Sequence, residues 1–297
     1  MTTIAVPGPF AAARRRKSGA AGRRWIAALP DLVARLCRRW SVELHQEEPP
    51  RYGDLALVLC GRYRGEPCVL KVSWPEHSTA HEAAALRAWN GRGAVRLLAA
   101  SPADGALLLE RLTPDRSLED LDLLTAAGIA GALVRELAVP APPGLPLLTE
   151  QARRIADGLG PSQARLGQPL PQAWVERATG LARDLAGAAG TTLVHTDLHY
   201  GNILAGPRGA WRAIDPRPAV GAPERSVPEL LWWRLDLTAR PSEVRALFDV
   251  LVAAGALDRA VARDWTIVRA VDYWLWGLEA GLTEDPVRCA RILEALT

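Results

Sequence analysis

The 297-residue sequence predicts an α+β fold in which a small strand-rich part precedes a larger, mostly helical part. Between residues 52 and 112, short apolar runs separated by turn-forming residues are typical of strands. From Ser117 onward, the apolar pattern is that of helices. One stretch, residues 193–215, interrupts that pattern with apolar segments around a polar loop. We place the domain boundary at Thr113-Pro114, between residues 1–112 and 113–297.

The composition excludes several classes of protein. With 49% hydrophobic residues, the chain can bury a sizeable core. Its net charge of +3 is too small and too dispersed to indicate nucleic-acid binding. Four cysteines without Cys-x-x-Cys spacing indicate reduced thiols. No apolar stretch approaches the ~18 residues of a membrane span, and the N-terminus lacks a signal-peptide pattern. We therefore expect a cytoplasmic protein with no membrane, nucleic-acid or obligate protein partner.

Residues 1–22 are expected to form a flexible N-terminal arm. Their basic cluster, residues 14–17, is interpreted as a solvated charge run in preference to a phosphate-binding element. A helix is predicted over residues 25–40, where apolar side chains recur at three- and four-residue steps.

A β-hairpin is predicted from strands 55–59 and 68–72 around the turn at residues 64–67. In its second strand Cys68, Leu70 and Val72 share one face, and Lys71 points to the other. The chain has only two lysines, so Lys71 in an apolar strand is notable. An ammonium group suits phosphate oxygens, and the alternative is a lysine that faces solvent.

The next helix begins at Ser78 and is expected to reach Asn90. Glu82, Leu86 and Trp89 fall on one face of it, so Glu82 points inward with the apolar residues. A buried carboxylate needs a partner, and Lys71 is the obvious one. The alternative is an acidic residue near the positive end of the helix dipole.

The remaining elements follow the same periodicities. Two further strands are predicted at residues 95–100 and 106–112. Helices are predicted at residues 149–159, 171–189, 226–237, 241–255, 257–281 and 286–296.

The pattern His195-x-Asp197-x-x-x-x-Asn202, followed by an apolar lead-in to Asp215, carries the most chemical information. Asp197 could accept the proton of an attacking hydroxyl, while Asn202 and Asp215 offer hard oxygen ligands to Mg²⁺. The alternative is a polar turn in which His195 and Asp197 satisfy backbone donors.

Taken together, these motifs resemble those of the aminoglycoside/hydroxyurea antibiotic resistance kinase family, and within it the aminoglycoside 6-phosphotransferases (streptomycin kinases). The resemblance extends over about residues 23–281. The segments that carry it are residues 24–30, 86–89, 95–98, 107–112, 139–145, 197–200 and 211–216.

The resemblance implies a protein-kinase-like, two-lobed fold: residues 23–112 as an N-lobe that binds ATP, and residues 113–297 as a C-lobe that binds the acceptor. It implies ATP and Mg²⁺ as cofactors. In the N-lobe, the resemblance implies that Gly53 forms a turn over the phosphates, that Lys71 contacts the phosphates and that Glu82 orients Lys71. The backbone of Glu110–Leu112 is expected to contact the adenine. In the C-lobe, it implies that His195 supports the loop, that Asp197 is the catalytic base, and that Asn202 and Asp215 bind the metal.

Two departures from the family pattern concern the phosphates and the acceptor. Gly53 stands alone where a fuller glycine turn is common. The family pattern Gly-Asp-Pro-x-x-Asp is here Gly221 to Ser226, with Ala222 and Ser226 at the acidic positions. A cationic acceptor needs nearby carboxylates, for which Asp272 and Glu279 are candidates; the alternative is that both are solvated helix charges.

We therefore expect an ATP-dependent phosphotransferase that phosphorylates a hydroxyl of a small antibiotic and so confers resistance, with a streptomycin-like aminoglycoside as first choice. The alternatives are the same chemistry on hydroxyurea or a nucleoside antibiotic, and a kinase-fold binding protein with little turnover. A protein kinase is disfavoured, because Asp215-Pro216 replaces Asp-Phe-Gly and no Ala-Pro-Glu segment is present.

Overall fold

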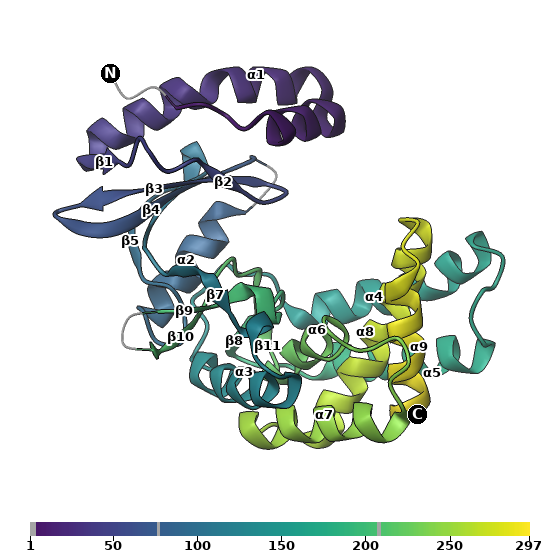
Figure 1. Ribbon diagram of the computed structural model, residues 1–297. Coiled ribbons are helices and arrows are strands. Elements are labelled where there is room, and N and C mark those ends of the chain that lie inside the picture. Colours follow the sequence, from purple (N-terminus) through teal and green to yellow (C-terminus); the bar gives the residue numbers. More distant parts are fainter. Residues whose placement is uncertain (1–3, 76–77, 207–208) are drawn as a thin grey trace. The chain divides into compact units, whose positions relative to one another are not determined.

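The computed structural model describes residues 4–75, 78–206 and 209–297 (Figure 1). Its contacts divide the chain into two compact units. Unit 1 comprises Met1–Gly91 and Val95–Leu112, and unit 2 comprises Arg92–Ala94 and Thr113–Thr297. Three residues after Gly91 therefore group with unit 2, although the residues on both sides of them belong to unit 1.

Unit 1 is built on an antiparallel sheet in which the central strands run in the order β1-β3-β4-β6-β5, with β2 paired to β3. The predicted hairpin is present as β3 and β4, joined by a tight turn in which Arg64 and Gly65 both have positive φ. The strands are β1 (Val42–Leu44), β2 (Arg51–Tyr52), β3 (Ala56–Tyr63), β4 (Glu66–Ser73), β5 (Leu97–Ser101) and β6 (Ala106–Glu110).

The first helix departs from the expected flexible arm. Helix α1 (Gly8–Trp40) includes most of residues 1–22, and Phe10, Ala11 and Arg14 within it are buried. The small residues and the basic run in residues 1–22 are typical of a solvated segment. In the structure, however, Phe10 packs into the apolar cluster of unit 1. That burial, which depends on distant residues, orders the segment.

The two faces of the sheet carry different chemistry, as the strand period predicts. Cys68, Leu70 and Val72 belong to the apolar cluster shared with α1, which Figure 1 shows in purple along one side of the sheet. Helix α2 (Thr79–Trp89) packs against β5 and β6. Lys71 alternates with the apolar set and pairs with Glu82 of α2.

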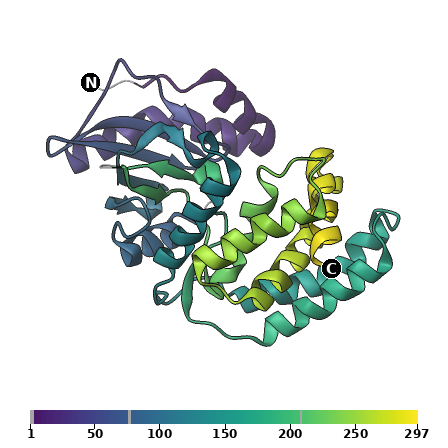
Figure 2. The same cartoon turned by 60° about the horizontal axis from the view of Figure 1, so that its bottom comes forward.

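Unit 2 is mainly helical, and Figure 2 shows two of its helices, α4 and α5, side by side in teal. Two small sheets accompany the helices, with strand orders β10-β9-β7 and β11-β8. The helices are α3 (Leu123–Leu137), α4 (Leu148–Arg165), α5 (Gln172–Gly187), α6 (Val227–Trp232), α7 (Pro241–Gly255), α8 (Arg259–Glu279) and α9 (Glu284–Leu296). The strands are β7 (Thr113–Ser117), β8 (Thr192–His195), β9 (Ile203–Ala205), β10 (Trp211–Ala213) and β11 (Pro218–Gly221).

Within the described residues, the structure contains no helix whose length and apolar content suit a membrane crossing.

Helix α3 packs closely on α7 through Gly131. A Cβ atom at this position would lie 2.7 Å from the Leu251 carbonyl oxygen and 2.9 Å from the Ala254 Cβ. At Gly128, one turn earlier on the same helix, the nearest atom to an added Cβ is at 3.9 Å, an ordinary contact. The two glycines therefore differ in space although both lie inside one helix.

We predict that Gly131→Ala lowers the stability of the protein by about 1–3 kcal/mol, because the two helices must move apart. Gly128→Ala is the matched control and should be stabilising by roughly 0.5–1 kcal/mol, since alanine favours a helix interior. Thermal and urea unfolding of both variants measure the difference. Equal effects would contradict the close approach of α3 and α7.

Candidate active site

Lys71 and Glu82 form a buried ion pair within unit 1. The Lys71 Nζ donates to the Glu82 Oε1 at 2.8 Å, and the two residues are 4% and 0% exposed. Because both charges are buried, removing either member of the pair would be destabilising, at a cost of about 3–5 kcal/mol. The predicted lysine–glutamate pair is thus present, and it fixes the Lys71 ammonium on the α2 side of the sheet.

The end of strand β6 is held by polar contacts on both sides. The Glu110 N–H donates to the Arg96 carbonyl at 3.0 Å, and the Glu110 carboxylate accepts from the Arg96 N–H at 2.8 Å. Arg111 donates to both carboxylate oxygens of Glu48, at 2.9 and 2.8 Å. These hydrogen bonds from Arg111 lower the pKa of Glu48 to about 2. Leu112 is buried.

The pairing of Glu48 with Arg111 could not be predicted from the sequence, because Glu48 lies in the loop between β1 and β2, far along the chain from Arg111.

Gly53, which the sequence analysis placed over the phosphates, lies in the turn between β2 and β3. Its N–H donates to the Ala56 carbonyl at 3.0 Å, and a Cβ atom there would meet open space.

His195 supports the loop from Asp197 to Asn202 in unit 2. Its ring is buried, its Nε2 lies 2.9 Å from the Ile214 carbonyl, and its Nδ1 lies 3.3 Å from the Asp197 N–H. An Nε2–H tautomer satisfies both contacts, donating to the carbonyl and accepting from the amide. This neutral ring therefore joins the start of the loop at Asp197 to the residue before Asp215.

The remaining oxygen-bearing residues are ordered by the same loop. The Asn202 Nδ2 donates to the Asp197 carbonyl at 2.9 Å, which leaves the amide oxygen Oδ1 for a cation. The Asn202 carbonyl accepts from the Ile214 N–H at 2.9 Å, so the next residue, Asp215, is anchored beside the loop. Asp215 has a φ of 52° and an exposed side chain. A hard-oxygen set of one amide and one carboxylate fits Mg²⁺.

Arg217 is a site residue that the sequence analysis missed. Its Nε lies 3.2 Å from the Asp197 Oδ2. Its backbone carbonyl accepts two hydrogen bonds from Thr196, at 3.1 Å from the amide and 2.8 Å from the hydroxyl. These bonds continue the β8–β11 pairing, in which Pro218 lies opposite His195. The antiparallel register therefore places a guanidinium on the carboxylate of Asp197.

The two positions at which the family pattern has an acid, Ala222 and Ser226, differ in their contacts. Ser226 is buried, and its hydroxyl donates to the His195 carbonyl at 3.2 Å, so a serine at this position contacts the start of the His195–Asn202 loop. Ala222 precedes the short helical turn Pro223–Ser226 and has no side chain that could do the same.

His199, which lies within the His195–Asn202 loop, contacts an aromatic side chain. The His199 ring stacks on Trp233 with centroids 3.6 Å apart and planes 11° from parallel. The Trp233 indole N–H donates to the Glu119 carboxylate, and Trp233 remains 42% exposed. Burial lowers the pKa of His199 to about 4, although Asp197, Glu119 and Asp215 oppose that shift.

The two candidate acceptor-binding carboxylates both pair with arginines inside unit 2. Asp272 pairs with Arg269, which also lies 3.4 Å from Glu229. Glu279 pairs with Arg165 at 3.2 Å, and both side chains are about half exposed. Neither carboxylate therefore presents an uncompensated negative charge.

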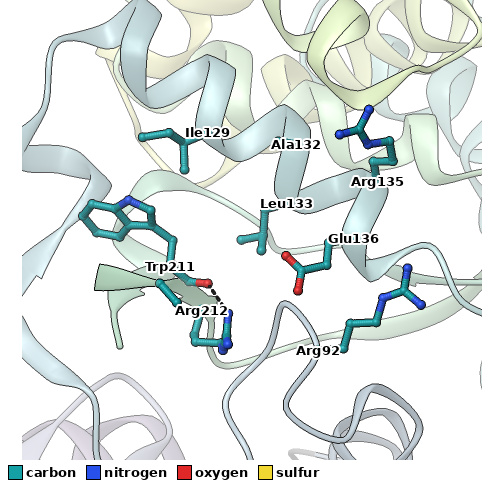
Figure 3. A pocket seen from close by; sticks show the side chains of 9 residues that line it. Arg92, Ile129, Ala132, Leu133, Arg135, Glu136, Trp211 and Arg212 are labelled. Carbon is teal, nitrogen blue, oxygen red and sulfur yellow. Dashed lines mark hydrogen bonds between the residues drawn. The ribbon is translucent and has the colours of Figure 1, made fainter. Parts of the chain in front are cut away.

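A hollow of about 530 Å³ on unit 2 contains none of the predicted site residues. Figure 3 shows its labelled side chains coming mainly from α3 and β10. Its lining is Arg92, Ile129, Ala132, Leu133, Arg135, Glu136, Ala210, Trp211 and Arg212.

Solved structures define the class of fold. The aminoglycoside phosphotransferase APH(4)-Ia aligns with a TM-score of 0.58 at 16% identity, covering 90% of this chain and 99% of that one. Choline kinase LicA from Streptococcus pneumoniae aligns with a TM-score of 0.57 at 12% identity, covering 90% and 99%. The fold is thus the protein-kinase-like fold of small-molecule phosphotransferases.

Sequence comparison identifies the family. The model of the aminoglycoside/hydroxyurea antibiotic resistance kinases matches residues 39–281. Streptomycin 6-kinase of Streptomyces glaucescens is 38% identical over 289 residues, which are 94% of this chain and 92% of that protein. Hydroxyurea phosphotransferase of Kitasatospora aureofaciens is 37% identical over 299 residues, 99% and 86% of the two chains. The chain belongs to the aminoglycoside/hydroxyurea antibiotic resistance kinase family.

The partly buried His199 ring predicts a pH dependence of stability. Above about pH 6.5 the ring is neutral in both the folded and the unfolded chain. Between pH 6.5 and about 4 only the unfolded chain binds the proton, so the free energy of unfolding falls as the pH drops through this window. Thermal unfolding of wild type and His199→Asn at pH 7 and pH 5 should show a smaller loss for the variant. Equal losses would contradict a lowered pKa of His199 in the folded chain.

Proposed function

We propose that this kinase transfers the γ-phosphoryl group of ATP to a hydroxyl of a small antibiotic, with a streptomycin-like aminoglycoside as the preferred acceptor. The observation that carries the proposal is the loop from His195 to Asn202 with Asp215 anchored beside it. ATP is supported by a related structure, a mutant of APH(4)-Ia in complex with ADP and hygromycin B. The acceptor class is supported by the two curated relatives.

In the proposed reaction, the acceptor hydroxyl lies against the Asp197 carboxylate. The hydroxyl oxygen forms a bond to the γ-phosphorus, and the bond from that phosphorus to the β–γ bridging oxygen breaks, so ADP leaves with that electron pair. The hydroxyl proton passes to Asp197 late in the step. Most of the rate enhancement would come from positioning and from charge stabilisation.

The other residues would bind ATP and neutralise the charge of its phosphates. Lys71, held by Glu82, would contact phosphate oxygens, and the backbone of Glu110–Leu112 would meet the adenine. Asn202 and Asp215 would hold Mg²⁺, which when bound neutralises charge on the β- and γ-phosphates. Arg217 would exchange its contact with Asp197 for the phosphoryl oxygens, supplying a guanidinium where charge develops.

The relatives support two kinds of acceptor. The streptomycin kinase and the hydroxyurea phosphotransferase are nearly equally similar to this chain, so identity does not separate them. A panel of streptomycin, other aminoglycosides, hydroxyurea and nucleoside antibiotics, followed by ADP release, tests the choice. Turnover on streptomycin supports the proposal; turnover on hydroxyurea alone would reassign the acceptor, and ATP binding without any turnover would favour a binding protein.

We predict that Asp197→Asn lowers kcat by about 10²–10⁴-fold, because the hydroxyl loses its proton acceptor. Asp215→Asn should cause a loss of similar order through weakened metal binding. Asp184→Asn, an exposed carboxylate on α5, is the control and should leave kcat unchanged. Steady-state kinetics with thermal unfolding of each variant measure this. Near-wild-type turnover of either site variant would refute the assigned roles.

We further predict that Arg217→Met lowers kcat roughly 10- to 100-fold while leaving thermal stability nearly unchanged, since an exposed ion pair contributes little to folding. Arg217→Lys should recover part of the loss because it restores the charge. Arg183→Met, an exposed arginine of α5, serves as the control. An equal loss in the lysine and methionine variants would argue against a role for the charge.

A further inference from the structure

The N-terminal part of α1 lies against the turn that follows strand β2. The helix breaks at Gly19, where φ is 53° and ψ is −128°, a conformation that L side chains rarely adopt. A Cβ atom at Gly22 would lie 2.5 Å from the Arg14 carbonyl oxygen. These two glycines allow residues 8–18 to change direction and pack closely on the start of the second helical segment.

The basic side chains of this first segment meet Asp54. Arg14 is only 3% exposed, and its Nη2 donates to the Asp54 carbonyl at 2.6 Å. The same guanidinium lies over the Trp74 ring, 5.3 Å from its centroid. Lys17 adds a salt bridge from its Nζ to the Asp54 Oδ2 at 2.8 Å, and its hydrogen bond lowers the pKa of that carboxyl.

Aromatic packing secures the same turn from its other end. The Phe10 ring lies 5.6 Å from the Tyr52 ring and 5.9 Å from the Trp25 ring, centroid to centroid. Beyond the turn, the Leu55 carbonyl accepts from the Trp74 N–H at 2.7 Å. Residues 52–55 are thus held between α1 and the end of β4.

Burying the charged side chain of Arg14 costs more free energy than burying an apolar side chain of similar size. A buried guanidinium loses its hydration, and among the described residues its Nε has no hydrogen-bond partner. A methionine of similar length could fill the same space at less cost. The cation adds a contact with the Trp74 ring, a long hydrogen bond to the Ser18 hydroxyl at 3.5 Å and a short charge-assisted bond to the Asp54 carbonyl. The bond to Asp54 fixes the position of the turn that contains Gly53.

We propose that residues 8–18 of α1 act as a clamp on the Gly53–Asp54 turn, with Arg14 as a positioning residue for ATP. The proposal rests on the proposed function, because it needs ATP as the phosphoryl donor and the place over the ATP phosphates that the family resemblance implies for the Gly53 turn. A turn with a single glycine has less conformational freedom to shape its backbone around the phosphates. A turn that is already fixed in position loses less entropy on binding. The family match begins at residue 39, so this segment lies outside it.

The test compares Arg14→Met with Arg15→Met, an exposed arginine next to it on the same helix. Arg14→Met should weaken ADP binding and raise the KM for ATP by about tenfold, as expected for loss of one buried charge-assisted hydrogen bond. Its kcat and its KM for the acceptor should stay near wild type. Arg15→Met should leave all these values unchanged. Titration calorimetry with ADP needs no acceptor and measures the binding directly.

A merely structural role would give a different result: a lower melting temperature for Arg14→Met with wild-type ADP affinity, which would overturn the proposal. If that variant does not fold, Lys17→Met and Asp54→Asn, both on exposed side chains, should each weaken ADP binding by a few-fold. Wild-type affinity in both would also overturn it.

The two proposals fail in distinguishable ways. A wild-type protein that binds ADP but phosphorylates no acceptor refutes the proposed function while the ADP affinities still decide on the clamp. A wild-type protein that turns over an acceptor, with Arg14→Met equal to it in ATP affinity, refutes the clamp alone. A wild-type protein that binds no ADP refutes both.

Discussion

Two hydrogen bonds of the His195 ring are the constraint on which the arrangement of Asp197 and Asp215 in unit 2 depends. One reaches forward to the amide of Asp197, and the other reaches across to the carbonyl before Asp215. The ring therefore sets the spacing of two carboxylates that lie 18 positions apart in the sequence. Ser226 adds a bond to the His195 carbonyl, so the backbone of this residue is fixed as well as its ring. A neutral, buried imidazole can do this without placing a further charge beside the acids.

Short sequence patterns predict those features of the site whose residues lie close together in the chain. Glu82 lies on the apolar face of an 11-residue helix, and Lys71 alternates with apolar residues in a strand, so their pairing could be predicted before any coordinates. The spacing of Asp197 and Asn202 likewise fits within one loop. The fold class and the break near residue 112 follow from changes in hydrophobic period, which a single sequence displays directly.

Other features depend on contacts between distant segments and could not be predicted. Arg217 reaches Asp197 only because β11 pairs with β8 in one particular register. Residues 8–18 have the composition of a solvated arm, and what orders them is a cluster with Tyr52 and Trp74. The sequence does contain one signal for that packing, Gly19 and Gly22, but glycines in a basic, alanine-rich stretch suggest flexibility equally well.

Charge compensation by arginine is a recurrent feature of this chain and bears on acceptor choice. Asp197, Asp272 and Glu279 each have an arginine partner. An acceptor that carries guanidinium groups would find no uncompensated carboxylate among these three, and would bind them only by displacing an arginine. Such an exchange is possible at low cost for Arg217 and Arg165, whose side chains are 64% and 54% exposed, and is costly for Arg269, which is 15% exposed. A cation would therefore replace the arginine partner of Asp197 or Glu279 more easily than that of Asp272.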